Sequence, residues 1–510
     1  MKINKPIIGC ALSVLLFSCY QDKGNYDYKD VNNFSLSFSP QGGEGNIYLI
    51  NQPGSQADTF LLSSVVTQTI NQDDSNLKYT WYRRQTVDGV KEPYKDTIYG
   101  KDNYMVFPES KKSEWDVTLI VRDEKADLEY YNHAIVKTKV PFVNTWNFLH
   151  QDGEQMKLGN LEIDMEGNAS WQPDNIKLMN NASFPRMTTV AYIPYGSDDF
   201  VELERLFIQS GTDSITLLNP FSLKIKGTWQ KFNMQPGTKI KKIVGNTMAS
   251  GPRIALIDAN GKFYYSEAWG TPKFQRSNDK AYPKLNVTDA YMNAEGKTIL
   301  WDAHNCQLLG CTDAGELGAI DGIRANQLKN KQAIWLGRGT TITKSGEGEN
   351  ALCILRDKNN GRYYFWNVDF GNSGGVYGKA HCDSLDSWGL TENSLFAVSN
   401  AWDNQIFFAE DNIIYLGRLD SKEKSVVYRM KEGYEIKKMA FKVCNASTHS
   451  SNQEKLFYLG IIVTKDGTDS LCELKLSIAA DVEEAKFYDL GEHTTVADFF
   501  FMAPQHEVDR

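Results

Sequence analysis

Two stretches of the chain, IALIDANGKFYY at residues 254–265 and CILRDKNNGRYYF at residues 353–365, follow one pattern. In each stretch an apolar run ends at an aspartate, Asp258 or Asp357, and a glycine-containing turn leads into a second run that is rich in aromatic residues. Short strands joined by a tight turn form β-hairpins, and the Asn-Gly pair of the first stretch suits a type I′ turn. We therefore expect both stretches to be hairpins.

Weaker copies of this pattern recur along the C-terminal two thirds of the chain. The aspartates that we assign to the repeat are Asp152, Asp213, Asp258, Asp313, Asp357, Asp411 and Asp466. Their spacing averages about 52 residues, the length of a four-stranded blade of a β-propeller. Seven copies predict a seven-bladed propeller.

The predicted propeller occupies residues 142–510, and a strand from Val496 to Met502 is expected to close the ring by pairing with the first blade. The first and last copies are the weakest, so six to eight blades fit the sequence. A row of further β-sandwiches is the competing interpretation, because it also consists of short strands at regular spacing.

Residues 34–141 show a different pattern, with apolar side chains at every second position. Leu77, Tyr79 and Trp81 share one face of a predicted strand, and a second strand with the same alternation runs from Trp115 to Val121. About 110 residues of this kind predict one Ig-like β-sandwich. The chain has no cysteine between residues 19 and 306, so Trp81 is expected to be held in the core by packing without an inter-sheet disulfide. The fold class is therefore all-β.

The composition excludes several classes of protein. The 510 residues are 41% hydrophobic, 12% aromatic and 23% charged, which describes a globular chain. The formal net charge of −9 argues against nucleic acid as a partner, because binding to a phosphate backbone requires a basic face.

The N-terminus reads MKINKPIIGCALSVLLFSC over residues 1–19. Lysines precede an apolar stretch too short to span a bilayer, as in a secretory signal peptide, and the stretch ends in Leu-Phe-Ser-Cys, which is similar to a bacterial lipobox. We predict a signal peptide at residues 1–18, lipidation of Cys19 and a tether at residues 19–33. The alternative is an ordinary signal peptide with an incidental cysteine.

The run CYQDKGNYDY at residues 19–28 resembles the start of the mature PKD-like lipoproteins of Bacteroidetes. Residues 79–82 (YTWY) and 115–123 (WDVTLIVRD) resemble the paired central strands of a PKD domain, although the Asp-Gly turn of that family is missing. The resemblance implies an outer-membrane lipoprotein beside a SusC/SusD-type transporter. Asp22 is similar to an export signal to the cell surface, and the periplasmic face of the membrane is the alternative location.

Aromatic side chains near turns are candidate ligand contacts, because sugar rings stack on aromatic faces. Four tryptophans of the propeller region have loop-like or polar neighbours. They are Trp269, Trp301, Trp388 and Trp402. Packing inside or between blades is the alternative interpretation of each.

The sequence offers little that points to catalysis. It has no H-E-x-x-H or paired Cys-x-x-Cys motif, no serine nucleophile elbow and no phosphate loop, so we expect neither a metal nor a cofactor. Six cysteines remain in the propeller region: Cys306, Cys311, Cys353, Cys382, Cys444 and Cys472. Of these, Cys306 and Cys311 are candidates for a local disulfide.

These observations predict a binding lipoprotein that captures a nutrient polymer, a glycan or glycoconjugate, at one mouth of the propeller for a SusC/SusD-type uptake system. The ligand class follows from the family resemblance. One alternative is a propeller polysaccharide lyase or glycosidase with two carboxylates at its centre. A second alternative is a protein-docking subunit of the transporter complex.

Overall fold

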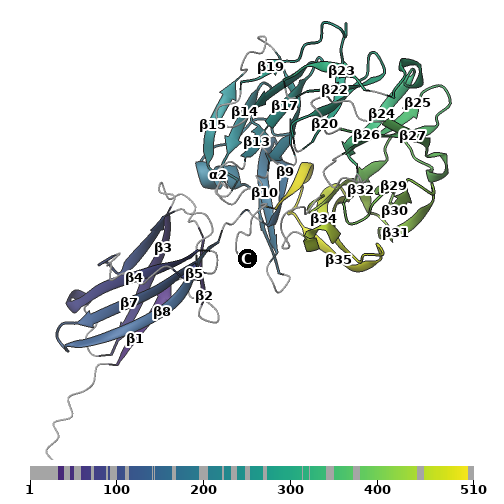
Figure 1. The fold of residues 1–510 in the computed structure, drawn as a ribbon. Helices are drawn as coiled ribbons and strands as arrows, with labels where there is room; N and C mark the ends of the chain where they lie inside the picture. The colour runs from purple at the N-terminus through teal and green to yellow at the C-terminus, as the bar shows by residue number, and fades with distance from the viewer. Residues whose placement is uncertain are drawn as a thin grey trace, which may run out of the picture. The chain divides into compact units, whose positions relative to one another are not determined.

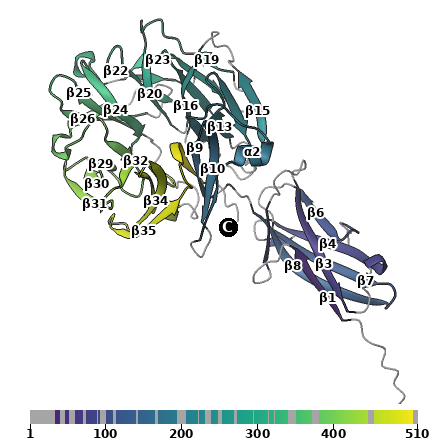
Figure 2. The same ribbon diagram turned by 180° about the vertical axis from the view of Figure 1, so that it is seen from behind.

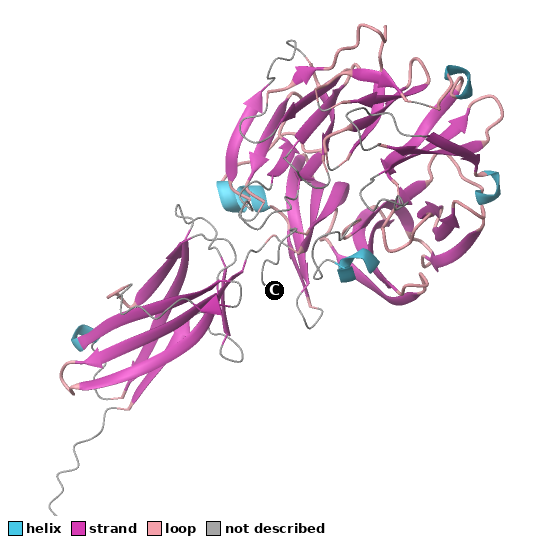
Figure 3. Cartoon of the chain, viewed as in Figure 1, coloured by secondary structure: helices cyan, strands magenta, loops and turns pink. Residues whose placement is uncertain are grey.

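The structure is a computed structural model. It describes residues 33–503, except for residues 40–45, 51–58, 70–73, 88–89, 92–99, 109–113, 140–141, 143, 164–167, 194–204, 221–222, 231–237, 247–252, 268–272, 294, 313, 321, 340–349, 371–379 and 445–452. The predicted signal peptide and tether, with Cys19, therefore lie outside the described residues. Strands dominate the chain (Figure 3), which forms two compact units that adjoin in sequence at Thr138 and Lys139. Within the described residues, no helix has the length and apolar character needed to cross a membrane.

The N-terminal unit is a sandwich of two antiparallel sheets, and Figure 2 labels most of their strands. One sheet has the order β1-β3-β6, formed by β1 (Phe34–Ser39), β3 (Thr59–Gln68) and β6 (Tyr104–Pro108). The other has the order β2-β8-β7-β4-β5, formed by β2 (Asn46–Ile50), β8 (Leu128–Lys139), β7 (Glu114–Asp123), β4 (Leu77–Val87) and β5 (Val90–Lys91). The alternation predicted for β4 and β7 is confirmed.

Trp81 lies at the centre of the sandwich core, as expected. Its side chain is fully buried, and its indole Nε1 donates a hydrogen bond to the carbonyl oxygen of Asp102 at 2.8 Å. Val117, Leu119 and Val121 of β7 are also fully buried. Packing of this kind holds the two sheets together without a disulfide.

The C-terminal unit contains seven four-stranded antiparallel sheets among the described residues (Figure 1). Blade 1 consists of β36 (Thr495–Met502), β9 (Thr145–Asp152), β10 (Gln155–Ile163) and β11 (Ala169–Gln172). Blade 2 consists of β12 (Val190–Ile193), β13 (Arg205–Gln209), β14 (Ser214–Leu218) and β15 (Ile225–Gln230). Blade 3 consists of β16 (Ile240–Gly245), β17 (Arg253–Asp258), β18 (Phe263–Glu267) and β19 (Gln275–Arg276).

Blade 4 consists of β20 (Val287–Met292), β21 (Thr298–Asp302), β22 (Gln307–Cys311) and β23 (Leu317–Ala319). Blade 5 consists of β24 (Lys331–Arg338), β25 (Asn350–Asp357), β26 (Tyr363–Asp369) and β27 (Ala380–Ser384). Blade 6 consists of β28 (Leu395–Ala397), β29 (Gln405–Glu410), β30 (Ile413–Arg418) and β31 (Lys424–Arg429). Blade 7 consists of β32 (Glu435–Phe441), β33 (Tyr458–Lys465), β34 (Thr468–Leu476) and β35 (Val482–Asp489).

Helices are short connections. They are α2 (Asn175–Asn180) and the 3-10 turns η2 (Asp74–Asn76), η4 (Ala325–Gln327), η5 (Asp386–Trp388) and η6 (Glu454–Phe457).

The ring closes as predicted. The C-terminal strand β36 pairs antiparallel with β9, with Met502 opposite Thr145, and Figure 1 shows this yellow strand beside the blue strands of blade 1. The predicted closing strand from Val496 to Met502 and the count of seven blades are both confirmed. The row of sandwiches is excluded because the last strand completes the sheet of the first blade.

The repeated aspartates mark the turn between the second and third strands of each blade. Asp258 shows their role: its Oδ1 accepts hydrogen bonds from the backbone N–H groups of Asn260 and Lys262, each at 2.8 Å. Such a side-chain bond to the following backbone favours a tight turn. One assignment was wrong in phase, because Asp302 occupies this turn in blade 4. Asp313 follows the third strand of that blade and lies outside the described residues.

Candidate functional site

The inner strand of each blade is the strand named first in the descriptions above, and these inner strands lie around the centre of the ring. β12 contacts β16, β20 contacts β24, and β32 contacts β36. Since the strands of a blade are antiparallel, the inner strands begin at the end of the ring that also carries the turns between the second and third strands. We call this end the entry face.

A β-bulge interrupts five of the seven inner strands near the entry face. Each bulge skips one residue in the pairing between the inner strand and the second strand, and it falls early in each inner strand. A bulge changes the direction of the side chain that follows it. The residues that follow the five bulges are Lys242, Asp289, Trp335, Lys438 and Asp498.

Four of these five residues are charged, and we call Lys242, Asp289, Lys438 and Asp498 the central cluster. Lys242 of blade 3 forms an ion pair with Asp289 of blade 4, with 2.5 Å between Nζ and Oδ1. Asp498 of blade 1 interacts electrostatically with Lys438 of the neighbouring blade 7 and with Lys242, two blades away. Equivalent positions on four blades thus bring two lysines and two aspartates together.

The four side chains of the cluster are half-buried, and the pKa values of Asp498 and Lys242 respond to that environment. Burial raises the pKa of Asp498, and the attraction of Lys438 and Lys242 only partly offsets this effect. Burial by itself lowers the pKa of Lys242, but the ion pair with Asp289 and the charge of Asp498 reverse the direction and raise it. Water still reaches Lys242, whose side chain is 42% exposed. The cluster therefore offers charged hydrogen-bonding groups that a ligand from solution can contact.

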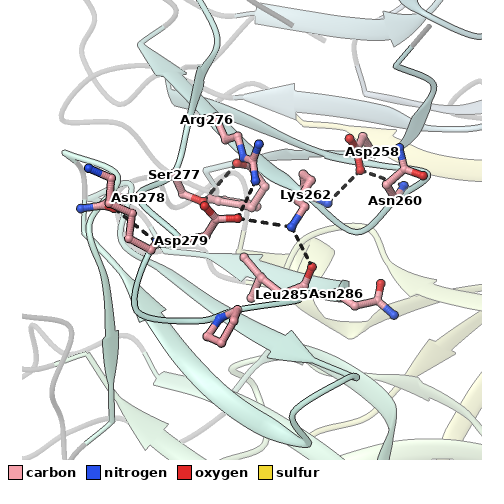
Figure 4. A network of polar contacts seen from close by, with 12 residues as sticks. Asp258, Asn260, Lys262, Arg276, Ser277, Asn278, Asp279, Leu285 and Asn286 are labelled. Atoms are coloured by element: carbon pink, nitrogen blue, oxygen red, sulfur yellow. Dashed lines mark hydrogen bonds and ion pairs between the residues drawn. The ribbon is translucent and has the colours of Figure 1, made fainter. Parts of the chain in front are cut away.

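A second polar network lies on the entry face of blade 3 (Figure 4). Asp279 accepts hydrogen bonds from Nη2 of Arg276 at 2.6 Å and from Nζ of Lys262 at 3.3 Å. Lys262 also donates to the carbonyl oxygen of Leu285 at 3.3 Å. Each charged group has a partner inside the network. The network therefore holds the segment that links β19 to β20 against the turn between β17 and β18.

Three of the four predicted tryptophan contacts lie in the core of the blades. Trp301, Trp388 and Trp402 are 1%, 0% and 3% exposed. Trp388 stacks on Phe408 with 5.1 Å between the ring centroids, and the indole of Trp402 packs edge-on against Phe407. Covered rings present no face to a ligand, so core packing describes these three residues. Trp269 lies outside the described residues.

The buried position of Trp301 has a physical reason. The second strand of a blade is covered on both faces by neighbouring blades, and all five residues of β21, which contains Trp301, are buried. Polar neighbours in the sequence therefore do not indicate exposure there. The central cluster was missed although it left a weak signal, a charged residue inside a short apolar run such as VADFFFM at residues 496–502.

The cysteines and histidines do not form a second site among the described residues. The six cysteines of the propeller are thiols. Cys306 directly precedes the extended strand β22 and Cys311 is its last residue, so about 16 Å of chain separates them and the candidate disulfide is wrong. Within the described part of the chain, no group of three or more His, Cys, Asp or Glu residues is arranged to hold a metal ion.

The PKD-like family matches this chain over residues 19–185. The match begins at Cys19 and continues through the sandwich into the first blade, which confirms the PKD-like resemblance for this part of the chain. No curated protein matches the chain.

Several solved structures are similar in fold. A quinoprotein alcohol dehydrogenase-like protein from Bacteroides thetaiotaomicron has 12% identity and a TM-score of 0.45, covering 93% of this chain and 99% of that one. A catalytically inactive virginiamycin B lyase from Staphylococcus aureus with quinupristin has 12% identity and a TM-score of 0.38, covering 60% and 85%. The WD40 domain of SCAP from fission yeast has 11% identity and a TM-score of 0.35, covering 63% and 85%.

Proposed function

We propose that this chain is a lipid-anchored binding protein whose propeller holds a glycan or glycoconjugate at the central cluster. The observation that carries the proposal is the convergence of Lys242, Asp289, Lys438 and Asp498 from four blades behind equivalent bulges. An ammonium group donates up to three hydrogen bonds and a carboxylate accepts several, so the cluster matches ligands whose hydroxyl groups both donate and accept.

The charges within the cluster balance, with two lysines against two aspartates. A neutral or weakly charged polyhydroxylated ligand therefore enters without a large electrostatic penalty, whereas a highly charged polymer leaves part of the cluster unmatched. The ligand displaces water from groups that the bulged strands already hold in place, so little ordering is required on binding.

We further propose that the mature protein starts at Cys19, is acylated there and sits on the outer membrane, at the cell surface, as an accessory of a SusC/SusD-type transporter. The lipobox-like sequence before Cys19 supports the anchor, and the family match that begins at the same residue agrees with it. The transporter and the surface location follow from the resemblance of residues 19–28 to PKD-like lipoproteins.

Adjacent lysines of β32 provide a matched test of the binding site. Lys438 belongs to the central cluster, whereas Lys437 is exposed and pairs with Glu435 at 2.7 Å. Residues 20–510 are tested on a glycan array and then titrated with the best ligand. We expect Lys438→Ala to weaken binding about tenfold or more, because a charged hydrogen bond is lost. Lys437→Ala is expected to bind like the wild type.

The same array decides between the proposal and its alternatives. Equal effects of the two lysine variants contradict a site at the central cluster. Release of shorter products from any polymer contradicts the binding proposal and supports the lyase or glycosidase alternative. The absence of binding to every glycan favours a subunit that docks on the transporter.

A further inference from the structure

The five-stranded sheet of the N-terminal unit has one face that points away from the sandwich core, and no residue of the central cluster belongs to this unit. Trp115, Val117, Leu119 and Val121 of β7 point into the core, so the residues between them point outward. Cross-strand pairing aligns Thr80, Ile120 and Tyr131 in one row. The neighbouring row contains Tyr82, Thr118 and His133.

Two tyrosines and an isoleucine lie at neighbouring positions of this face, on three adjacent strands, and we call Tyr82, Ile120 and Tyr131 the tyrosine strip. Ile120 lies on β7, between Tyr82 on β4 and Tyr131 on β8, and the two tyrosines interact electrostatically. Strands in a sheet lie about 4.8 Å apart, so the strip extends about 10 Å across three strands. This length accommodates more than one pyranose ring.

Tyr131 is held in an orientation that leaves its ring open to solvent. Its side chain is 62% exposed, and its hydroxyl donates a hydrogen bond to Oε2 of Glu129 at 2.6 Å. Glu129 lies two residues earlier on the same strand and the same face, so the bond draws the ring along the sheet. A ring fixed in this way costs little side-chain entropy when a ligand stacks on it.

Ion pairs border the strip on both sides. Asp116 contacts Arg84 and His133, each at 2.5 Å, and Arg122 contacts Asp127 at 2.6 Å. The charges around the strip are thus matched by one another, and a charged ligand would have to compete with existing partners. This arrangement favours a neutral ligand, and the charged side chains at the border still have hydrogen-bonding capacity for hydroxyl groups.

The size of the strip distinguishes a glycan from a protein partner. A stable protein interface buries about 800 Å² on each partner and has an apolar centre, which three side chains across about 10 Å do not supply. Apolar ring faces bordered by hydrogen-bonding groups are the usual form of a sugar-binding surface. We propose that the tyrosine strip is a second binding site, which takes a neutral polysaccharide chain independently of the central cluster.

Affinity electrophoresis of residues 20–510 tests this site. Native gels contain amylopectin, galactomannan or hydroxyethylcellulose, and retardation is compared among the wild type, Tyr131→Ala and Tyr104→Ala. Tyr104 is a matched control, because it is 41% exposed on the other sheet of the same sandwich. The wild type is expected to be retarded in at least one gel. Tyr131→Ala should raise the dissociation constant at least fivefold, and Tyr104→Ala should leave it unchanged.

Further variants separate this site from the central cluster and from a folding defect. Tyr131→Phe keeps the ring and is expected to retain most of the retardation, whereas the double variant Tyr82→Ala, Tyr131→Ala should leave only the retardation that the central cluster contributes. Lys438→Ala should leave the strip's contribution intact. No retardation of the wild type in any gel, equal loss in Tyr104→Ala, or loss in Lys438→Ala alone would each overturn the proposal. Circular dichroism of every variant verifies that the sandwich is folded.

Discussion

Trp146 and Glu473, 327 residues apart in sequence, are joined by a hydrogen bond of 2.6 Å from the indole Nε1 to Oε2. Trp146 belongs to β9 of blade 1 and Glu473 to β34 of blade 7, so the bond crosses the closure of the ring. Lys442 of the loop after β32 reaches the same carboxylate oxygen at 2.9 Å. All three side chains are largely buried. We call these three residues the seam, because they join blade 7 to blade 1 by charged contacts in addition to the pairing of β36 with β9.

Removing the carboxylate at the seam is expected to destabilise the propeller. Glu473→Gln leaves the Lys442 ammonium buried without its counter-charge, and loss of one partner of a buried pair costs about 3–5 kcal/mol. Urea denaturation followed by tryptophan fluorescence measures the loss. Glu483→Gln is the control, because its pair with Lys475 at 3.1 Å is exposed to solvent and contributes little to stability. Similar effects of the two variants would contradict a seam role for Glu473.

Ionisation of the Asp498 carboxyl is expected to lower the stability of the folded protein as the pH rises. Burial raises the pKa of its carboxyl in the folded protein, so the folded state holds its proton to a higher pH than the unfolded chain. Stability is thus lost between the ordinary aspartate pKa and the raised value. Asp498→Asn should melt like the wild type in acid and at a higher temperature near pH 7, while ligand affinity falls. Thermal melts across pH 3 to 8 check this, and a difference that is constant with pH would contradict it.

The turn aspartate of blade 4 is expected to be a structural residue. Asp302 is fully buried and accepts hydrogen bonds from the backbone N–H groups of Asn286 at 3.1 Å, His304 at 3.1 Å and Asn305 at 3.3 Å. Asp302→Ala leaves these three backbone donors without their acceptor and should cost roughly 1–3 kcal/mol of unfolding free energy. Asp302→Asn keeps one carbonyl oxygen and should cost less. Chemical denaturation ranks the two variants, and the reverse order would argue against the turn role.

Trp388 is expected to affect stability and leave binding unchanged. Its ring stacks on Phe408 and its indole Nε1 donates to the carbonyl oxygen of Lys422 at 3.1 Å. Trp388→Ala should lower the unfolding free energy by about 3–5 kcal/mol, as for other large core truncations. Ligand titration well below the melting temperature should give the wild-type affinity. A weaker affinity in the folded variant would restore Trp388 as a ligand contact.

The lipid anchor is tested by Cys19→Ala in the complete chain. A free thiol at the cleavage site is required for acylation, so the variant should move from the membrane fraction to the soluble fraction and should no longer incorporate labelled palmitate. Cys10→Ala is the control, because the apolar stretch before that cysteine is too short to serve as a signal peptide. Continued membrane association of Cys19→Ala would contradict the lipoprotein assignment.

The blade pattern could be predicted because turn chemistry is local. The aspartate and the glycine or asparagine that follow it are within a few residues of each other, as at Asp258 and Gly261, and the turn forms wherever they occur between apolar runs. The same locality explains the error in blade 4. Asp302 and Asp313 both follow an apolar run, and only the pairing of β21 with β22 decides which one lies at the equivalent turn.

The sequence by itself determined the all-β class, the seven repeats, the closing strand and the alternation that places Trp81 in the sandwich core, since each depends on near neighbours along the chain. The tertiary structure alone decided which side chains meet. A one-residue bulge reverses the face that alternation assigns to Lys242 and Asp498, and ring closure brings Trp146 to Glu473. Burial of a strand between two blades likewise hides Trp301, because exposure depends on neighbours that the local sequence does not contain.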